Sequence, residues 1–313
     1  MIRRLLVALL VVAAGAAGTA VLAQRGAHPT ARAAAAPGPL PVALGGQGTA
    51  PSPLAVRLDV PRDPLRVAFD RPPGAGLMFD LDTGAVLWRR RAGAVLPIAS
   101  LTKMMTALLV VERVPSFGRV RVTREALRFR GSGVGMLPKG RLIPVDTMLH
   151  GLLLPSGNDA AIALAQRVGG GSQRAFVRLM NDRARAMGLT CTRFATPSGI
   201  RDAGNHSCAG DLAALARAVL LKPRLARIVR KRSAELRFPT KGGKLYLYNT
   251  NPLLRERYRG ATGLKTGYTD AAGHCLVATA TRAGTRLGVV LLDSPDPGRQ
   301  AERLLDLGFA TNR

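Results

Sequence analysis

The chain has 313 residues, of which 47% are hydrophobic and 4% aromatic, and its formal net charge is +27. This length and apolar content exclude a disordered chain and allow a sizeable core, which Leu, Val and Ala must pack because aromatic residues are scarce. The charge is typical of nucleic-acid-binding proteins, but neither zinc-finger spacing nor a basic strand interleaved with aromatics accompanies it, so we expect attraction to anionic surfaces and no nucleic acid.

The N-terminal residues predict export. Arg3 and Arg4 precede an uncharged apolar stretch, residues 5–23, that ends in small residues. Residues 1–23 are therefore a signal peptide or an N-terminal anchor, and in either case the rest of the chain lies outside the cytoplasm. Residues 24–73, rich in Ala, Pro and Gly, follow as a predicted linker. Residues 74–313 are the predicted folded body.

Periodicity within this body predicts an α+β fold. Alternation around a Thr-Gly turn predicts a hairpin over residues 76–88. Apolar residues at helical spacing predict a helical lobe of about residues 101–220, with helices at 100–114, 145–154, 160–168, 173–187 and 209–220. Strands are expected at 230–238, 264–269, 274–283 and 286–292, and a closing helix at 299–307. These elements predict a sheet of early and late strands with the helical lobe inserted between them.

The three cysteines and four histidines show no metal-ligand spacing, so neither a metal nor any other cofactor is expected. Cys191 and Cys208 flank a loop rich in Pro, Gly and Asn, and they are the natural disulfide pair of an exported protein. Cys275 lies in an apolar run and is expected to be a buried thiol.

A first motif pairs a hydroxyl with an amine. Ser100 and Lys103 are three residues apart at the start of the first predicted helix, so both side chains share one helix face. The helix N-terminus favours a developing anion. The alternative is a capped helix with a solvated Lys, but this helix is otherwise apolar, and a Lys buried in it must be paired or neutral.

Two further motifs are ambiguous when taken singly. Ser156-Gly157-Asn158 lies between two apolar helices and can project a hydroxyl and an amide into a cleft, although either side chain could instead cap the next helix. Lys265-Thr266-Gly267 lies on a predicted strand with glycines on both sides, which allow close approach of a substrate backbone. Its Lys and Thr suit a carboxylate, but an ordinary Lys guarding a sheet edge is the alternative.

The ordered trio is more specific than its parts. Together with the flanking residues 97–106, 152–161, 194–199, 249–254 and 263–273, it resembles the serine D-Ala-D-Ala carboxypeptidases, the low-molecular-mass penicillin-binding proteins. The resemblance covers about residues 74–309. It implies a β-lactamase/transpeptidase-like fold, in which helices flank an antiparallel sheet and a mainly helical lobe is inserted.

The resemblance also implies a role for each motif residue. Ser100 attacks the carbonyl of the penultimate D-Ala, Lys103 is the base for acylation, and Ser156 relays protons to the leaving amine. Neutrality of Lys103 near pH 7 requires a pKa about three units below the ordinary value. Burial and the second cation, Lys265, both act in that direction.

The remaining residues of the implied site bind the substrate. Asn158 holds its amide, and Lys265 and Thr266 bind its terminal carboxylate. The oxyanion hole consists of the N–H groups of Ser100 and Tyr268, the residue after Gly267.

The implied partners are a peptidoglycan stem peptide and, as covalent inhibitors, β-lactams. A D,D-endopeptidase acting on cross-links stays open, because the same site serves both activities. A class A-like β-lactamase is less favoured, because no Glu stands between Ser156 and Phe194 to activate a deacylating water. Anionic cell-wall polymers or lipid headgroups are further expected partners. Arg299 is a candidate for assisting the carboxylate, and its assignment stays open.

Overall fold

The computed structural model describes residues 53–59, 62–239 and 242–311. The predicted signal or anchor, residues 1–23, lies outside the described residues, as does most of the predicted linker. No helix within the described ranges is both long and apolar enough to cross a membrane.

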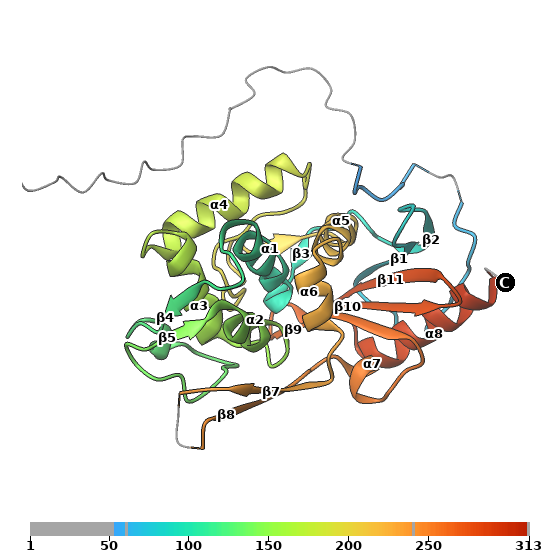
Figure 1. Ribbon diagram of the computed structural model, residues 1–313. Coiled ribbons are helices and arrows are strands. Elements are labelled where there is room, and N and C mark those ends of the chain that lie inside the picture. Colours follow the sequence, from blue (N-terminus) through green and yellow to red (C-terminus); the bar gives the residue numbers. More distant parts are fainter. Residues whose placement is uncertain (1–52, 60–61, 240–241, 312–313) are drawn as a thin grey trace, which may run out of the picture. The chain divides into compact units, whose positions relative to one another are not determined.

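A five-stranded antiparallel sheet is the centre of the fold (Figure 1). Its strands, in spatial order, are β2 (Val86–Arg90), β1 (Ala75–Asp80), β11 (Thr285–Leu292), β10 (Gly273–Arg282) and β9 (Ala261–Thr269). Early and late segments of the chain therefore share one sheet, as the sequence predicted. β9 is one of the two edge strands, the other being β2, and it starts three residues before the predicted strand at 264–269.

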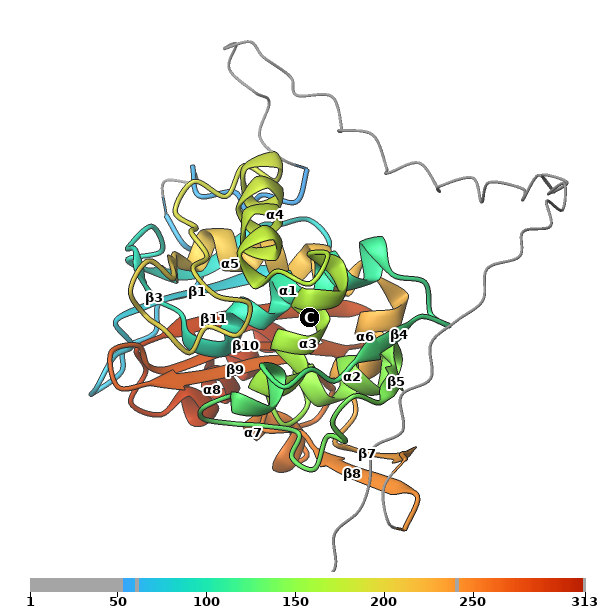
Figure 2. The ribbon, with the colours of Figure 1, turned by 90° about the vertical axis from the view of Figure 1, so that its left-hand side faces the viewer.

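Helices cover both faces of this sheet (Figures 1 and 2). The closing helix α8 (Pro297–Thr311) packs on one face, where Leu304 and Leu305 meet Val289 and Leu291 of β11. The helical lobe packs on the other face, where Val290 and Leu292 of β11 join the main core. Because both faces of β11 are buried, its apolar run shows no polar alternation.

The helical lobe surrounds α1 (Lys103–Arg113), whose residues from Lys103 to Val110 are all buried. The predicted helices are confirmed as α1, α2 (Val145–Leu153), α3 (Asn158–Val168), α4 (Gln173–Ala186) and α5 (Ala209–Leu220). Elements that the sequence did not predict are η1 (Ala99–Thr102), η2 (Ala126–Arg128), α6 (Pro223–Val229), α7 (Pro252–Arg255) and the short paired strands β3 (Leu96–Pro97) with β6 (His206–Ser207) and β4 (Arg119–Arg121) with β5 (Leu142–Pro144).

Two boundary predictions need correction. The predicted strand 230–238 is shorter, β7 (Ser233–Arg237), because α6 extends to Val229; it pairs with the unpredicted β8 (Lys244–Tyr248) in a separate hairpin outside the main sheet. The predicted linker extends too far. Its described residues pack on the body, with Asp63 paired to Arg89 and Phe69 edge-on to Trp88.

The cysteine predictions are confirmed. Cys191 and Cys208 form a disulfide that links the loop after α4 to the start of α5. Cys275 is a buried free thiol on β10, and burial raises its pKa to about 12. Such a thiol stays protonated and is a poor nucleophile.

Candidate active site

Ser100 lies in the 3-10 turn η1, directly before α1, and the edge strand β9 packs beside this turn. Ala99 has a φ of 44°, a left-handed value that a non-glycine residue rarely adopts. Such strained residues cluster at functional sites, where the surrounding structure holds them. Ser100 is therefore held at the junction of the sheet and the helical lobe.

Lys103 reaches Ser100 across one turn, as the spacing predicted. Its Nζ lies 2.7 Å from Ser100 Oγ and also donates a hydrogen bond to the Ser198 carbonyl oxygen at 2.8 Å. The side chain is 0% exposed. A solvated Lys on a capped helix is thus excluded, and the residue is buried with two oxygen partners.

The electrostatic surroundings of Lys103 favour the neutral amine. Burial lowers its pKa well below the ordinary value, and the nearby Lys265 ammonium lowers it further. The Asp159 carboxylate acts in the opposite direction and raises the pKa of Lys103. A neutral amine in hydrogen-bond contact with a hydroxyl is the arrangement that a general base requires.

The Ser156-Gly157-Asn158 motif forms the turn into α3. Ser156 has a φ of 65°, and its buried Oγ has no hydrogen-bond partner among the described residues. Asn158 is the first residue of α3; its amide nitrogen donates to the Arg130 carbonyl, whereas Oδ1 is buried without a described partner. The helix starts two residues earlier than predicted, and neither side chain caps it.

The Asp159 carboxylate fixes the loop opposite this turn. It accepts hydrogen bonds from the backbone N–H groups of Val134 and Gly135, and burial raises its pKa despite these bonds. Ser132 of the same loop lines the cleft, and its carbonyl accepts from the Asn158 N–H.

Lys265 does not serve to prevent pairing at an exposed sheet edge, although β9 is an edge strand. Its side chain is only 1% exposed, and burial lowers its pKa to about 7. Its Nζ donates to the Thr266 carbonyl at 2.8 Å. The Thr266 hydroxyl lies 2.7 Å from that of Thr250, so two hydroxyls stand together at the mouth of the site.

Gly267 brings β9 against the nucleophile. A Cβ at this position would lie 3.0 Å from the Ser100 backbone nitrogen and 3.1 Å from the Ile98 carbonyl oxygen. A side chain at this position would force the strand and the turn apart by a few tenths of an ångström. Tyr268, the next residue, is 56% exposed, and its ring lies 4.6 Å from that of His274.

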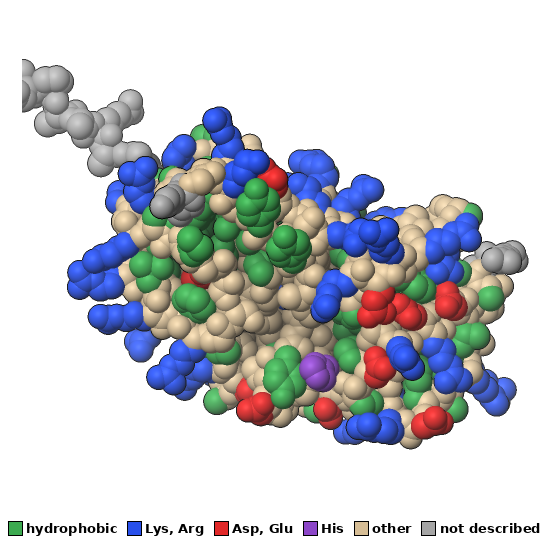
Figure 3. All heavy atoms as spheres, turned by 90° about the horizontal axis from the view of Figure 1, so that it is seen from below, with side chains coloured by type: hydrophobic (Ala, Val, Ile, Leu, Met, Phe, Trp, Pro, Cys, Tyr) green, Lys and Arg blue, Asp and Glu red, His purple; other side chains and the backbone are tan. Residues whose placement is uncertain are grey.

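These residues line one cleft of about 870 Å³ on the face seen in Figure 3. Its walls include Ser100, Ser156, Thr266, Gly267 and Tyr268. Lys103, Asn158 and Lys265 lie buried behind the walls. All three sequence motifs thus meet at one place, from segments far apart along the chain.

Sequence reasoning overlooked several contributors. The Ser198 carbonyl lies in the segment 194–199, and Thr250 lies in the segment 249–254. Both segments carry the family resemblance, but the sequence assigned no role to either residue. Glu256, which belongs to no motif, also lines the cleft. Arg299, the candidate whose assignment the sequence left open, lies there as well. Ser132 has no motif of its own, so no sequence signal could have identified it.

Comparison with known proteins identifies the family of the chain. Residues 72–296 match the family model described as D-alanyl-D-alanine carboxypeptidase. The chain belongs to this family. A relative from Mycobacterium tuberculosis, the D-alanyl-D-alanine carboxypeptidase DacB2, is 38% identical over 251 residues, 78% of this chain and 84% of the relative. DacF of Bacillus subtilis is 34% identical over 244 residues, which are 75% of this chain but 62% of that protein.

Solved structures of the family share the fold. A DD-transpeptidase of Streptomyces K15 superimposes with a TM-score of 0.73 at 30% identity, covering 78% of this chain and 100% of that one. A D-alanyl-D-alanine carboxypeptidase of M. tuberculosis gives a TM-score of 0.74 at 35% identity, covering 80% and 96%. The predicted α+β transpeptidase-like fold is confirmed. Aligned to the longer curated relatives, such as DacF, the chain spans about three fifths of their length.

Proposed function

We propose that the chain is an exported serine D-Ala-D-Ala carboxypeptidase that removes the terminal D-Ala from peptidoglycan stem pentapeptides. The contact between the buried Lys103 amine and the Ser100 hydroxyl, which lines the cleft, carries this proposal. Family membership supports the substrate class.

Acylation starts with proton transfer from Ser100 Oγ to the neutral Lys103 Nζ. The activated oxygen attacks the carbonyl carbon of the penultimate D-Ala, and the tetrahedral intermediate collapses with release of the last D-Ala. The departing amine takes up the proton from Lys103 through Ser156, whose hydroxyl has no hydrogen-bond partner within the described part of the chain. Water then hydrolyses the ester on Ser100 and restores the free enzyme.

The substrate carboxylate binds on β9. Lys265 supplies positive charge, and the paired hydroxyls of Thr266 and Thr250 can donate hydrogen bonds. A bound carboxylate favours the ammonium form of Lys265, so binding raises its pKa above the value of about 7 in the free protein. The N–H groups of Ser100 and Tyr268 receive the oxyanion, and Asn158 Oδ1 is the acceptor available to a substrate amide.

The direct test incubates the protein with a pentapeptide ending in D-Ala-D-Ala and measures free D-Ala. A control peptide ending in L-Ala-L-Ala should stay intact. A fluorescent penicillin should label the wild type covalently, and Ser100→Ala should abolish both labelling and D-Ala release. Label on another residue would refute the assignment.

The same assays separate the alternatives. Cleavage of cross-linked muropeptide dimers without release of D-Ala from the pentapeptide would identify an endopeptidase. Rapid steady turnover of penicillin would identify a β-lactamase; we expect a persistent adduct instead. Labelling without any turnover of peptide would identify a binding protein.

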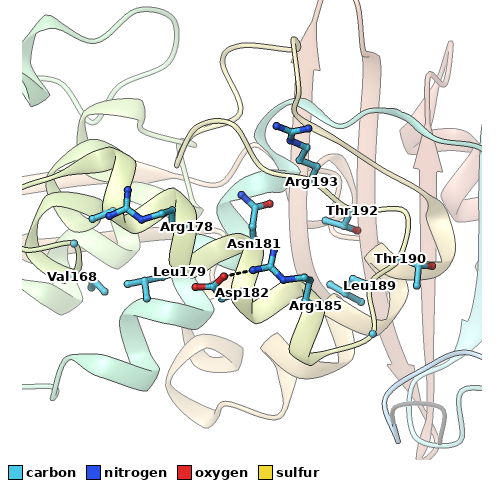
Figure 4. A pocket seen from close by; sticks show the side chains of 13 residues that line it. Val168, Arg178, Leu179, Asn181, Asp182, Arg185, Leu189, Thr190, Thr192 and Arg193 are labelled. Atoms are coloured by element: carbon cyan, nitrogen blue, oxygen red, sulfur yellow. Dashed lines mark hydrogen bonds and ion pairs between the residues drawn. The ribbon is translucent and has the colours of Figure 1, made fainter. Parts of the chain in front are cut away.

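We further propose that the chain acts outside the cytoplasm, secreted or tethered by residues 1–23, and associates there with anionic cell-wall polymers. The net charge of +27 supports long-range attraction to them. A groove of about 1030 Å³ along α4 offers a local site (Figure 4). Arg178 and Arg193 on its walls have no ion-pair partner among the described residues, whereas Arg185 pairs with Asp182.

This association predicts salt-dependent retention on a wall polymer rich in phosphodiesters. The double variant Arg178→Gln/Arg193→Gln should weaken retention at low salt, and Arg257→Gln/Arg259→Gln, which removes two exposed Arg elsewhere, should weaken it much less. Equal effects would show that only net charge matters. Binding to anionic lipid vesicles in place of the polymer would favour headgroups as the partner.

A further inference from the structure

The β4–β5 hairpin, at one end of the helical lobe (Figure 1), has a buried and an exposed face. Val120 and Ile143 pair in register and are 0% exposed, so they form its inner face. Because side chains alternate along a strand, the next pair, Arg121 with Leu142, points outward. Both of these residues are exposed, and Arg119 lies on the same outer face, two residues before Arg121.

A large aromatic side chain stands at the corner that leads into this hairpin. Phe117 is the third residue of a turn, which the Gly118 N–H closes by donating to the Pro115 carbonyl oxygen at 2.9 Å. It is 86% exposed, more than any other large hydrophobic residue in the described ranges. Turns form readily from Gly, Pro and small polar residues, so the turn itself does not require this ring. Phe117 therefore adds nothing to the core, and its ring is available to a partner.

The hairpin is also strongly basic. Arg119 and Arg121 donate to backbone carbonyls of the hairpin itself, and neither has an ion-pair partner among the described residues. Residues 113–144 contain eight Lys and Arg side chains against one acidic side chain, Glu125. In Figure 3, Lys and Arg side chains line the left-hand rim of the molecule, the end at which β4 and β5 lie in Figure 1.

A bilayer with anionic headgroups accommodates both properties of this surface. Its phosphate groups attract guanidinium groups, and its interface takes up aromatic and aliphatic side chains. A hydrophilic anionic polymer would neutralise the arginines but would leave Phe117 and Leu142 in water. The apolar side chains therefore favour a bilayer over a wall polymer as the partner of this surface.

The sequence also brings a bilayer within reach. Residues 1–23, the predicted signal or anchor, direct the chain to the membrane. Residues 24–52 span at most roughly 100 Å even when fully extended, so an anchor joined through them keeps the folded body near the lipid surface.

We propose that Phe117, Arg119, Arg121 and Leu142, together the Phe117 face, dock the folded body on an anionic lipid bilayer. The ring of Phe117 and the side chain of Leu142 enter the interface, and the two guanidinium groups meet lipid phosphates. This docking is separate from the reaction at Ser100 and does not rest on the proposed function.

Binding is tested with the chain from residue 24 onward, which lacks the apolar stretch and keeps every described residue. It should co-sediment with vesicles of phosphatidylglycerol and phosphatidylcholine, and at least tenfold more weakly with phosphatidylcholine alone. Arg119→Gln/Arg121→Gln should lower the affinity about twentyfold, because each basic side chain at an anionic leaflet contributes about fivefold. Arg257→Gln/Arg259→Gln, with the same loss of charge at two exposed positions elsewhere, should lower it less than about twofold.

The apolar contribution has its own variant and control. Phe117→Ala should lower the affinity for the mixed vesicles about tenfold, the scale of partial burial of one aromatic side chain. Tyr248→Ala removes another exposed aromatic side chain, 69% exposed on the β7–β8 hairpin, and should bind as the unsubstituted chain does. Both variants should keep the melting temperature of the parent chain.

Fluorescence shows whether the corner itself enters the lipid. The chain has a single Trp, Trp88, which is 5% exposed and gives a constant background. In Phe117→Trp, the mixed vesicles should shift the emission to shorter wavelength, and brominated acyl chains should quench it. The matched Tyr248→Trp variant should show neither effect.

Four results would overturn the docking: no binding of the parent chain to the mixed vesicles, equal losses in the two Arg pairs, full binding by Phe117→Ala, or unshifted emission of Phe117→Trp. Retention on a phosphodiester-rich wall polymer that falls in Phe117→Ala, without vesicle binding, would assign the Phe117 face to the polymer instead. Phe117→Ala should release D-Ala from free pentapeptide at the parent rate. Failure of the parent chain to release D-Ala would refute the proposed function and leave the vesicle results to decide the docking.

Discussion

Replacing Gly267 by Ala tests whether close approach of β9 is needed for catalysis. The added Cβ would lie 3.0 Å from the Ser100 nitrogen, 3.1 Å from Ala99 Cβ and 3.1 Å from the Ile98 carbonyl oxygen. All three atoms belong to the backbone or to a Cβ, so no flexible side chain can move aside. The strand itself must withdraw by a few tenths of an ångström.

We expect the substitution to lower the rate of acylation more than the stability of the fold. Misplacement of a substrate by about 1 Å can cost roughly a hundredfold in rate, so a few tenths predict about tenfold. The new methyl group also stands against the Ser100 N–H, a proposed oxyanion donor, and loss of one such donor costs about a hundred- to a thousandfold. We therefore expect acylation to slow by about ten- to a thousandfold.

The assay is the second-order rate constant of labelling by a fluorescent penicillin, together with D-Ala release and the melting temperature. Gly93→Ala is the matched control, because a Cβ there meets no atom within 4 Å. It should react as fast as the wild type. Full acylation rates in Gly267→Ala, with an unchanged melting temperature, would refute the argument from close approach.

Other predictions follow from the electrostatics and the disulfide. Lys265→Gln removes a cation that lowers the pKa of Lys103, so the acid limb of the acylation profile should move to higher pH; Asp159→Asn should move it to lower pH. The pKa of Lys265 is about 7 in the folded chain and roughly 10.4 in the unfolded chain. Burial of Lys265 therefore lowers the free energy of unfolding by its full amount below pH 7, and this penalty disappears as the pH rises to roughly 10.4. Urea unfolding should therefore show a stability gain over that window, by roughly 5 kcal/mol, which Lys265→Met lacks. Cys191→Ser/Cys208→Ser, which opens a link between residues 17 apart, should lower the unfolding free energy by about 3 kcal/mol.

Local patterns predicted most elements, because helices and hairpins depend on contacts close in sequence. The five main helices of the lobe and the first hairpin lie where periodicity indicated. The failures were of two kinds. Of the β7–β8 hairpin only β7 was predicted, and it was assigned to the main sheet. The residues before Ala75 were interpreted as a linker from composition, although contacts such as that of Asp63 with Arg89 attach them to the body.

For the candidate site, the sequence by itself determined the reactive pair and the order of the three motifs. Ser100 and Lys103 are neighbours on one turn, so their contact depends on helix geometry alone. The tertiary structure alone decided what these groups can do. Burial lowers the pKa of Lys103, the Ser198 carbonyl accepts a hydrogen bond from its amine, and Gly267 lets β9 approach Ser100 closely. Each of these effects comes from chain segments distant in sequence.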